Sequence, residues 1–400
     1  MIYIILFLLF LFPIYSCDYK LWNHGDSYER GSIYLGYYIF LLLLVVAILG
    51  FRNYVGGDTI GYMEMWSKIP TLSELVHFDF LHAKYAPMWY IFNSVCKSIC
   101  KDFWFFQLLH VSIVNSIIFY TISRYSQYRF TAVFLYAAVT MLYFNCEILR
   151  ESLSLSFGLL GLAYYKDKKW LKYYVFALVA LSFHKSAIIL FFLPLLYKYA
   201  KMEIDFKTLA IVIGIGFVFS SFLLSKIVQY VFPFFLDSFD KYAAMERASV
   251  LGNARSVLMV LLLAYLVRYY DTSKEMVDVC ICSKFYLLAN IIGLFMPIFT
   301  SRFANYFQVY YLILLGDFLW NHFQAKKILV YALYVNFIFA AVKHQARDVS
   351  SWVSSTSHGY YFYQRYYPYY SIFDDIPYDD LHHRKNIYYQ VRLNSLKHND

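Results

Sequence analysis

Long apolar runs recur along the whole chain, and short polar or charged segments separate them. Most runs are long enough to cross the hydrocarbon core of a bilayer, about 30 Å thick, as a helix. Backbone groups in lipid must be hydrogen-bonded within their own segment, and helices achieve this. The pattern predicts an all-α polytopic integral membrane protein with about 12 transmembrane helices, at residues 1–15, 31–50, 103–122, 130–146, 149–165, 170–183, 185–200, 207–230, 254–269, 285–300, 303–320 and 327–343.

The apolar stretch from Trp170 to Tyr199 is too long for one ordinary span and too short for two full ones. The polar segment Ser182-Phe183-His184-Lys185-Ser186 interrupts it, which predicts a helical hairpin with its turn at His184. The first run, Met1 to Ile14, lacks a basic leading segment and a small-residue cleavage site before Cys17, so we interpret it as a helix.

Composition supports the membrane prediction. The chain is 61% hydrophobic and 15% charged, with a mean hydropathy of +0.49, and a soluble domain needs more charged surface. The net charge of +9 is scattered over short loops, which argues against nucleic-acid binding. Six dispersed cysteines do not form a disulfide framework, and we expect Cys96 and Cys100 to be packing residues. The 43 tyrosines suit a membrane interface and can also stack on sugar rings.

Basic residues predict the topology, since lysine and arginine are enriched in cytoplasmic loops. Alternate short loops carry them: Arg124 and Arg129; Lys166, Lys168, Lys169 and Lys172; Lys198, Lys201 and Lys207; Arg268, Lys274 and Lys284; Lys326 and Lys327. We therefore expect a transmembrane domain over residues 1–343 with outer loops 51–102 and 231–254, and an extracytoplasmic C-terminal tail over residues 344–400. An even number of helices places both termini outside.

A second set of ionisable residues stands at the opposite helix ends. Charge at a membrane boundary either anchors a helix or serves a site, and snorkelling anchors should favour the cytoplasmic side. These residues all fall on the outer face instead, and they are Arg52, Asp58, Glu147, Arg150, Glu151, His184, Arg255 and Arg302. Their grouping on one face predicts a single extracytoplasmic site that binds an anion.

The segment Phe51-Arg52-Asn53-Tyr54-Val55-Gly56-Gly57-Asp58-Thr59-Ile60-Gly61-Tyr62 follows directly on a predicted span. An anchor needs only the arginine, whereas a Gly-Gly turn that presents a carboxylate suits a functional site. Arg52 would bind phosphate, and Asp58 would act as a base or bind a sugar hydroxyl. The alternative is an internal pair between Arg52 and Asp58 that pins the loop.

Two further motifs carry candidate chemistry. Arg150 heads an apolar helix, where a bidentate guanidinium and the helix dipole both attract phosphate; the alternative is a pair with Glu147. His184 is a candidate general base in the hairpin turn; the alternative is a hydrogen-bonded helix cap.

In the later part of the chain, Arg302 in a tight outer turn is a candidate phosphate ligand, and Arg255, with Arg247, is a weaker one beside an amphipathic segment.

The C-terminal region contains Asp374-Asp375-Ile376-Pro377-Tyr378-Asp379-Asp380, which could bind a hard cation but fits a solvated acidic tail better. The run Tyr366-Tyr367-Pro368-Tyr369-Tyr370 could stack on sugars or pack on the outer surface. The sequence contains no P-loop, zinc motif, GxSxG elbow or Rossmann fingerprint, so we expect neither a metal nor a nucleotide cofactor.

These residues resemble a known family. Arg52…Gly57-Asp58-Thr59…Tyr62 is similar to the R-x-x-x-G-x-D-T-x-x-Y pattern of the EpsG-like group of Wzy polysaccharide polymerases. Arg150 opening a helix, His184-Lys185-Ser186-Ala187, Arg302…Tyr306-Phe307 and Tyr367-Pro368-Tyr369 also resemble that group in the same order, over nearly the whole chain. One departure is Glu151, where similar proteins often have glutamine; Glu151 would neutralise Arg150.

The resemblance implies a GT-C-like membrane glycosyltransferase. Such enzymes join oligosaccharide repeat units of O-antigen or capsule, carried on undecaprenyl diphosphate, at the periplasmic face of the inner membrane. The partners are then the lipid-linked donor and acceptor, with a chain-length regulator protein as a further candidate. Arginines would stabilise the diphosphate leaving group without a metal. The acceptor hydroxyl needs a base, for which Asp58 ranks first and His184 second.

Three other functions remain open from the residues. An O-antigen ligase would use the same donor and face with lipid A core as acceptor, although the Arg52 to Tyr62 motif favours a polymerase. A lipid-linked oligosaccharide flippase should carry charge at several depths, whereas these charges gather at one end. An acyltransferase would need a cytoplasmic acyl-donor site, which the sequence does not suggest.

Overall fold

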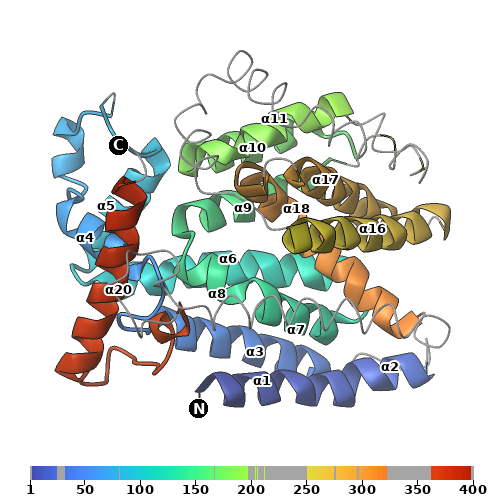
Figure 1. Cartoon of the computed structure of the whole chain (residues 1–400), viewed down its shortest axis with the longest axis horizontal. Helices are drawn as coiled ribbons and strands as arrows, with labels where there is room; N and C mark the ends of the chain where they lie inside the picture. Colours follow the sequence, from blue (N-terminus) through green and yellow to red (C-terminus); the bar gives the residue numbers. More distant parts are fainter. Residues whose placement is uncertain are drawn as a thin grey trace.

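The computed structural model describes residues 2–24, 32–80, 82–165, 167–196, 203, 205, 211, 250–273, 276–294, 297–321 and 362–397. Within them the protein is all-helical, apart from one isolated bridge between Arg52 and Ser371 (Figure 1). The α-helices are α1 (Ile2–Pro13), α2 (Tyr19–His24), α3 (Ser32–Gly50), α4 (Thr59–Lys68), α5 (Pro87–Ile99), α6 (Phe103–Tyr125), α7 (Arg129–Val139), α8 (Met141–Cys146), α9 (Leu149–Leu162), α10 (Trp170–Phe183), α11 (Ile188–Phe192), α16 (Val250–Ser273), α17 (Val277–Gly293), α18 (Pro297–Asn321) and α20 (Tyr378–Lys397). Shorter π or 3₁₀ segments are η1 (Ile14–Asp18), η3 (Glu74–His77), η4 (Lys185–Ala187), η5 (Leu193–Leu196) and η8 (Phe362–Arg365).

The long helices pack side by side and alternate in direction (Figure 1). Helix α3 ends and α6 begins at the end of the bundle where α4, α5 and α20 lie. Since a helix rises about 1.5 Å per residue, the 23 residues of α6 carry Arg124 about 30 Å away from that end. The predicted inner loop at Arg124 and Arg129 and the predicted outer segment after Gly50 therefore lie at opposite ends of the bundle.

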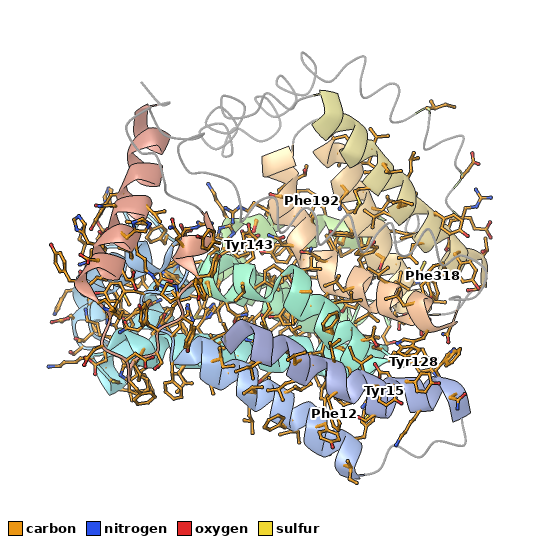
Figure 2. The ribbon with its side chains drawn as sticks, turned by 60° about the horizontal axis from the view of Figure 1, so that its bottom comes forward. Phe12, Tyr15, Tyr128, Tyr143, Phe192 and Phe318 are labelled. Atoms are coloured by element: carbon orange, nitrogen blue, oxygen red, sulfur yellow. The ribbon has the colours of Figure 1, made fainter. Side chains whose placement is uncertain are left out.

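Large apolar side chains are exposed on several helices of the bundle, and we call this surface the apolar belt. On α3, Ile33 and Leu43 are 72% and 60% exposed, and Leu171 on α10 is 82% exposed. Phe12 and Tyr15, at the end of α1 and in η1, also face outward (Figure 2). Such a surface is unfavourable in water and suits lipid. Among the described residues, two helices are long and apolar enough to cross a membrane, at Ile33–Gly50 and Phe103–Tyr125, and three shorter apolar helices accompany them.

The structure confirms the all-helical class and changes several predicted bounds. The predicted outer loop 51–102 contains α4, η3 and α5 instead of irregular chain. Helix α5 begins with Pro87, whose fixed φ suits a first helical turn, and it buries Trp89, Asn93 and Cys96 along one face. The predicted span 130–146 is divided at Thr140, where φ is −132°. The spans 207–230 and 327–343 lie outside the described residues, and the number of spans stays a prediction.

The turn predicted near Arg302 is wrong. Helix α17 ends at Gly293 and α18 begins at Pro297, so Arg302 lies inside the second turn of α18. A proline is accommodated at the start of a helix, whereas nothing in Thr300-Ser301-Arg302 breaks one. The predicted start at residue 254 is also late, because α16 begins at Val250.

The described C-terminal residues pack against the chain that follows α3. Besides the Arg52–Ser371 bridge, the amide of Asn53 donates to the carbonyl of Tyr370 at 2.8 Å, and the amide of Gly56 donates to the carbonyl of Arg365 at 2.8 Å. Segments more than 300 residues apart are thereby joined at the end of the bundle that carries α4, α5 and α20 (Figure 1).

Candidate active site

A cavity of about 590 Å³ opens at this end of the bundle. Its walls come from the start of α4, the segment before α5, the start of α9, the turn after α10 and the start of α18. The lining side chains that carry charge or chemistry are Asp58, Tyr62, Lys84, Tyr85, Glu147, Arg150, Glu151, His184, Lys185, Ser186 and Arg302. Five separate stretches of the sequence therefore meet around one space.

The Gly-Gly turn presents Asp58 to this cavity, as the sequence suggested. Gly56 has φ +116°, a conformation that residues with a Cβ rarely adopt, and a Cβ there would also overlap Cys146. At Gly57 a Cβ would overlap the carboxylate of Glu147, while the Gly57 amide donates to Glu147 Oε1 at 3.0 Å. Both glycines are needed for the chain to pass close to the end of α8 and to start α4 directly after Asp58.

The surroundings raise the pKa of Asp58 to about 7. The main cause is burial, followed by the negative charge of Glu147; Arg365, Arg302 and Arg150 oppose the shift. The carboxylate is nevertheless accessible from the cavity, although protein surrounds it on other sides. Asp58 is thus a carboxylate that exchanges a proton near neutral pH at the wall of an open space.

Glu147 fixes the turn and the C-terminal segment to each other. It accepts from Gly57, forms an ion pair with Arg365 at 3.5 Å, and accepts a hydrogen bond from the Tyr366 hydroxyl. The preceding Asn145 is itself held by Asn115 at 2.9 Å, which fixes the end of α8. With these partners, Glu147 positions the walls of the cavity, and its charge acts on Asp58.

Arg150 lies in the first turn of α9, as expected. Its guanidinium carbon lies 4.1 Å from the centre of the Tyr85 ring, which is a cation–π geometry. The alternative pairing with Glu147 is not formed, because Glu147 is bonded to Arg365, and Arg150 has no carboxylate within ion-pair distance in the described part of the chain. Its Nε atom is buried without a hydrogen-bond partner. Arg150 therefore keeps its positive charge for a ligand.

Arg302 meets Glu151 across the cavity wall. Its Nη1 atom lies 2.5 Å from Glu151 Oε2, and Asn305 donates to Glu151 Oε1 at 2.7 Å. The side chain of Glu151 is 1% exposed and that of Arg302 is 33% exposed. Glu151 therefore neutralises Arg302, and not Arg150 as the sequence suggested, because α18 brings Arg302 to it from 151 residues away.

His184 occupies the predicted hairpin turn between α10 and η4. Its Nδ1 atom lies 2.6 Å from the Ser186 hydroxyl and accepts from the Ser186 amide at 3.3 Å. The Ser186 hydroxyl contacts the Tyr306 hydroxyl at 3.0 Å, which in turn contacts Ser154 at 2.7 Å. Burial lowers the pKa of His184 to about 3, so the ring is neutral, and the accepting Nδ1 leaves the proton on Nε2. His184 therefore forms the hydrogen-bonded cap that was the alternative interpretation, and it also lines the cavity; its role as a general base stays a prediction.

One predicted phosphate ligand, Arg52, does not line the cavity, and the side chain of another, Arg255, is outside the described residues. Arg52 is fully buried, donates to the carbonyls of Leu49 and Val55, and does not line the cavity. The prediction that Arg52, Arg150 and Arg302 converge is therefore wrong for Arg52, because its side chain bends back toward the end of α3. The alternative ion pair between Arg52 and Asp58 is not formed either. The backbone of Arg255 lies in α16, but its side chain is outside the described residues, as is Arg247.

Three contributors were missed by sequence reasoning. Lys84 and Tyr85 come from the segment before α5 and carry no motif. Arg365 directly precedes the tyrosine run at Tyr366, so its position next to an expected functional segment was the one available signal. The acidic run 374–380 does not line the cavity, and Asp374, Asp375 and Asp379 are exposed. Within the described residues, no group of three or more His, Cys, Asp or Glu side chains is placed to hold a metal ion.

The geometry suits the binding of an anion next to a carboxylate that exchanges a proton. Glu147 is paired with Arg365 and Glu151 with Arg302, whereas Asp58, Arg150 and Lys84 line the cavity without a carboxylate–cation pair among the described residues. Fixed cations in a partly enclosed space stabilise a phosphate whose charge increases.

Comparison with known protein families gives a match over most of the chain. The model of a family described as the EpsG family matches residues 35–381, which is most of the chain. No curated protein and no solved structure matches. The matched range includes every residue that lines the cavity.

Proposed function

Because the chain belongs to the EpsG family, a family of Wzy-like polysaccharide polymerases, we propose that it polymerises oligosaccharide repeat units linked to undecaprenyl diphosphate. The growing chain leaves its lipid diphosphate and is transferred to a sugar hydroxyl of a second lipid-linked unit. The observation that carries this proposal is the cavity itself, which Asp58, Arg150 and Lys84 line together at one end of an apolar helical bundle.

Each group in the cavity has a role in this reaction. Arg150, with Lys84, Lys185 and the partly neutralised Arg302, binds the diphosphate and stabilises the charge that develops as it leaves. Asp58 takes the proton of the attacking hydroxyl, since its pKa of about 7 suits general base catalysis. We rank His184 below Asp58 because the Nδ1 of its neutral ring is already occupied, so the ring donates a hydrogen bond and does not accept a proton.

The proposal includes the location of the site. The cavity lies at the end opposite the basic segments around Arg124 and Arg129, which the positive-inside rule assigns to the cytoplasm. The active site then faces the periplasm, in a multi-pass inner-membrane domain over residues 1–343, with residues 344–400 on the same side. The lipid part of the substrate lies along the exposed apolar belt. We propose that the reaction needs neither a divalent metal nor a nucleotide, because the donor is already activated as a diphosphate.

Deleting the gene tests the function. A polymerase mutant should leave single repeat units on the cell surface and abolish long polymer, and the wild-type gene should restore the polymer. Loss of even the single repeat would indicate a flippase or an early transferase. Unchanged polymer that is no longer attached to lipid A would indicate a ligase. Gel profiles of the surface polysaccharide distinguish these outcomes.

A further inference from the structure

A second cavity, of about 520 Å³, adjoins the first. The two cavities share a wall made of Asp58, Tyr62, Lys84, Tyr85 and Arg150. The second cavity extends away from Lys185 and Arg302 and lies among α4, the segment before α5, and α20. Its volume is within the range of about 300–1,000 Å³ that small-molecule sites occupy. The candidate base, Asp58, therefore lies between two cavities. This arrangement suits a reaction between two large substrates.

The second chamber differs chemically from the first. Beyond the shared wall its lining includes the rings of Phe78, Tyr90 and Tyr388, and the centroids of the Phe78 and Tyr90 rings are 4.7 Å apart. Beyond the shared wall it also contains one acid and one base, Glu64 and Lys68, so this part of its lining carries no net charge. Aromatic rings pack on the apolar faces of sugars, and mixed polar groups bind hydroxyls. The lining thus suits an uncharged sugar better than a diphosphate.

The C-terminal helix completes this chamber. Tyr388 on α20 faces Gly61 on α4, where a Cβ would overlap the Tyr388 hydroxyl. On the same helix, the Tyr389 hydroxyl donates to Glu64 Oε1 at 2.7 Å, which holds the carboxylate in place. The absence of a side chain at Gly61 lets α20 approach closely enough for the Tyr388 ring to form part of the wall.

We propose that the second cavity is the acceptor site, which binds the terminal sugar of the acceptor repeat unit by stacking on Phe78 and Tyr388. This inference rests on the proposed function. In the reaction, the acceptor hydroxyl oxygen bonds to the anomeric carbon of the donor sugar. The bond from that carbon to the diphosphate oxygen breaks, and its electron pair leaves with the diphosphate held near Arg150. The hydroxyl proton passes to Asp58 from the acceptor's side of the shared wall.

A transfer assay that separates donor from acceptor tests this assignment. The acceptor is the repeat-unit oligosaccharide released from the cells' own polymer, labelled at its reducing end and lacking lipid diphosphate, so it cannot act as donor. The donor is the lipid-linked repeat, and the full-length protein is reconstituted in nanodiscs. We expect Tyr388→Ala and Phe78→Ala each to raise the KM for the labelled acceptor by about 5- to 10-fold, with the KM for donor within about twofold of wild type. Tyr388→Phe should retain the wild-type KM.

Two controls make the result specific. Tyr378→Ala removes an aromatic ring from the same helix outside both cavities, where the ring is 77% exposed, and should change neither KM. Lys185→Ala, in the first cavity alone, should raise the KM for donor and leave the KM for acceptor unchanged. Thermal unfolding shows whether each variant is folded.

The failures can be told apart. Wild-type protein that transfers nothing to the labelled acceptor and forms no polymer from the lipid-linked repeat would overturn the proposed function. Wild-type transfer with an unchanged acceptor KM in both folded ring variants would overturn the acceptor site alone. A raised donor KM in Tyr388→Ala would also overturn it, since the chamber would then hold donor sugars.

Discussion

The pH dependence of polymerisation follows from the environment of Asp58. Its pKa of about 7 means that the carboxylate is about 10% ionised at pH 6 and about 90% ionised at pH 8. A general base works only when ionised, so activity is lost as the pH falls through 7. We expect the rate at pH 8 to exceed that at pH 6 by about tenfold. This tenfold difference applies to kcat/KM, because the pKa of about 7 is that of Asp58 in the protein without substrate.

Three variants test whether Asp58 is the group that sets the pH profile. Arg365 lowers the pKa of Asp58 and neutralises Glu147, so Arg365→Gln should shift the profile to higher pH and reduce the rate at pH 7. Asp58→Asn should reduce the rate by about 100-fold or more and remove the pH dependence, while the protein still inserts into the membrane. His184→Ala should retain some product.

The assay is the initial rate of polymer formation from lipid-linked repeats by reconstituted protein, between pH 5.5 and 8.5 at constant ionic strength. A flat profile between pH 6 and 8 would refute the reasoning, as would an Asp58→Asn variant that keeps much of the activity with an unchanged profile. If His184→Ala were the more damaged variant, the role of base would pass to His184.

Other predictions concern the arginines and the metal requirement. Arg150→Lys should reduce activity by at least about tenfold in the transfer assay, because a point charge does not reproduce a bidentate guanidinium; wild-type activity would remove Arg150 from the diphosphate site. Arg52→Ala should lower the unfolding temperature instead of raising the KM for donor, and the reverse result would return Arg52 to the site. Arg302→Gln should destabilise the fold by up to about 3 kcal/mol, less than a fully buried pair because Arg302 is 33% exposed, and adding Glu151→Gln should restore much of this loss; no recovery in thermal unfolding would contradict the pairing. Chelation by EDTA should leave activity unchanged, and a strict Mg²⁺ requirement would make the acidic run 374–380 a candidate ligand set again.

The sequence alone determined the helical class, the hairpin turn at His184 and the grouping of ionisable residues at one end. These features depend on local properties, namely the length of the apolar runs, the residues that interrupt them and the sign of the charge carried by the loops. The same reasoning found Asp58, because a Gly-Gly turn followed by a carboxylate is itself a local signal. It placed the turn near Arg302 wrongly, since the decisive Pro297 lay within an apolar run.

The tertiary structure alone decided which charge pairs with which. Arg52 and Arg302 look alike in the sequence, yet one is bound to backbone carbonyls near its own helix and the other meets Glu151 at the cavity wall. Lys84 and Arg365 carry no motif and become part of the site or its support through packing. An ion pair depends on distances of a few ångströms between segments as much as 218 residues apart, as for Glu147 and Arg365, where 365 − 147 = 218. Hydrophobic periodicity specifies which face of a helix is buried, and only the packed bundle fixes those distances.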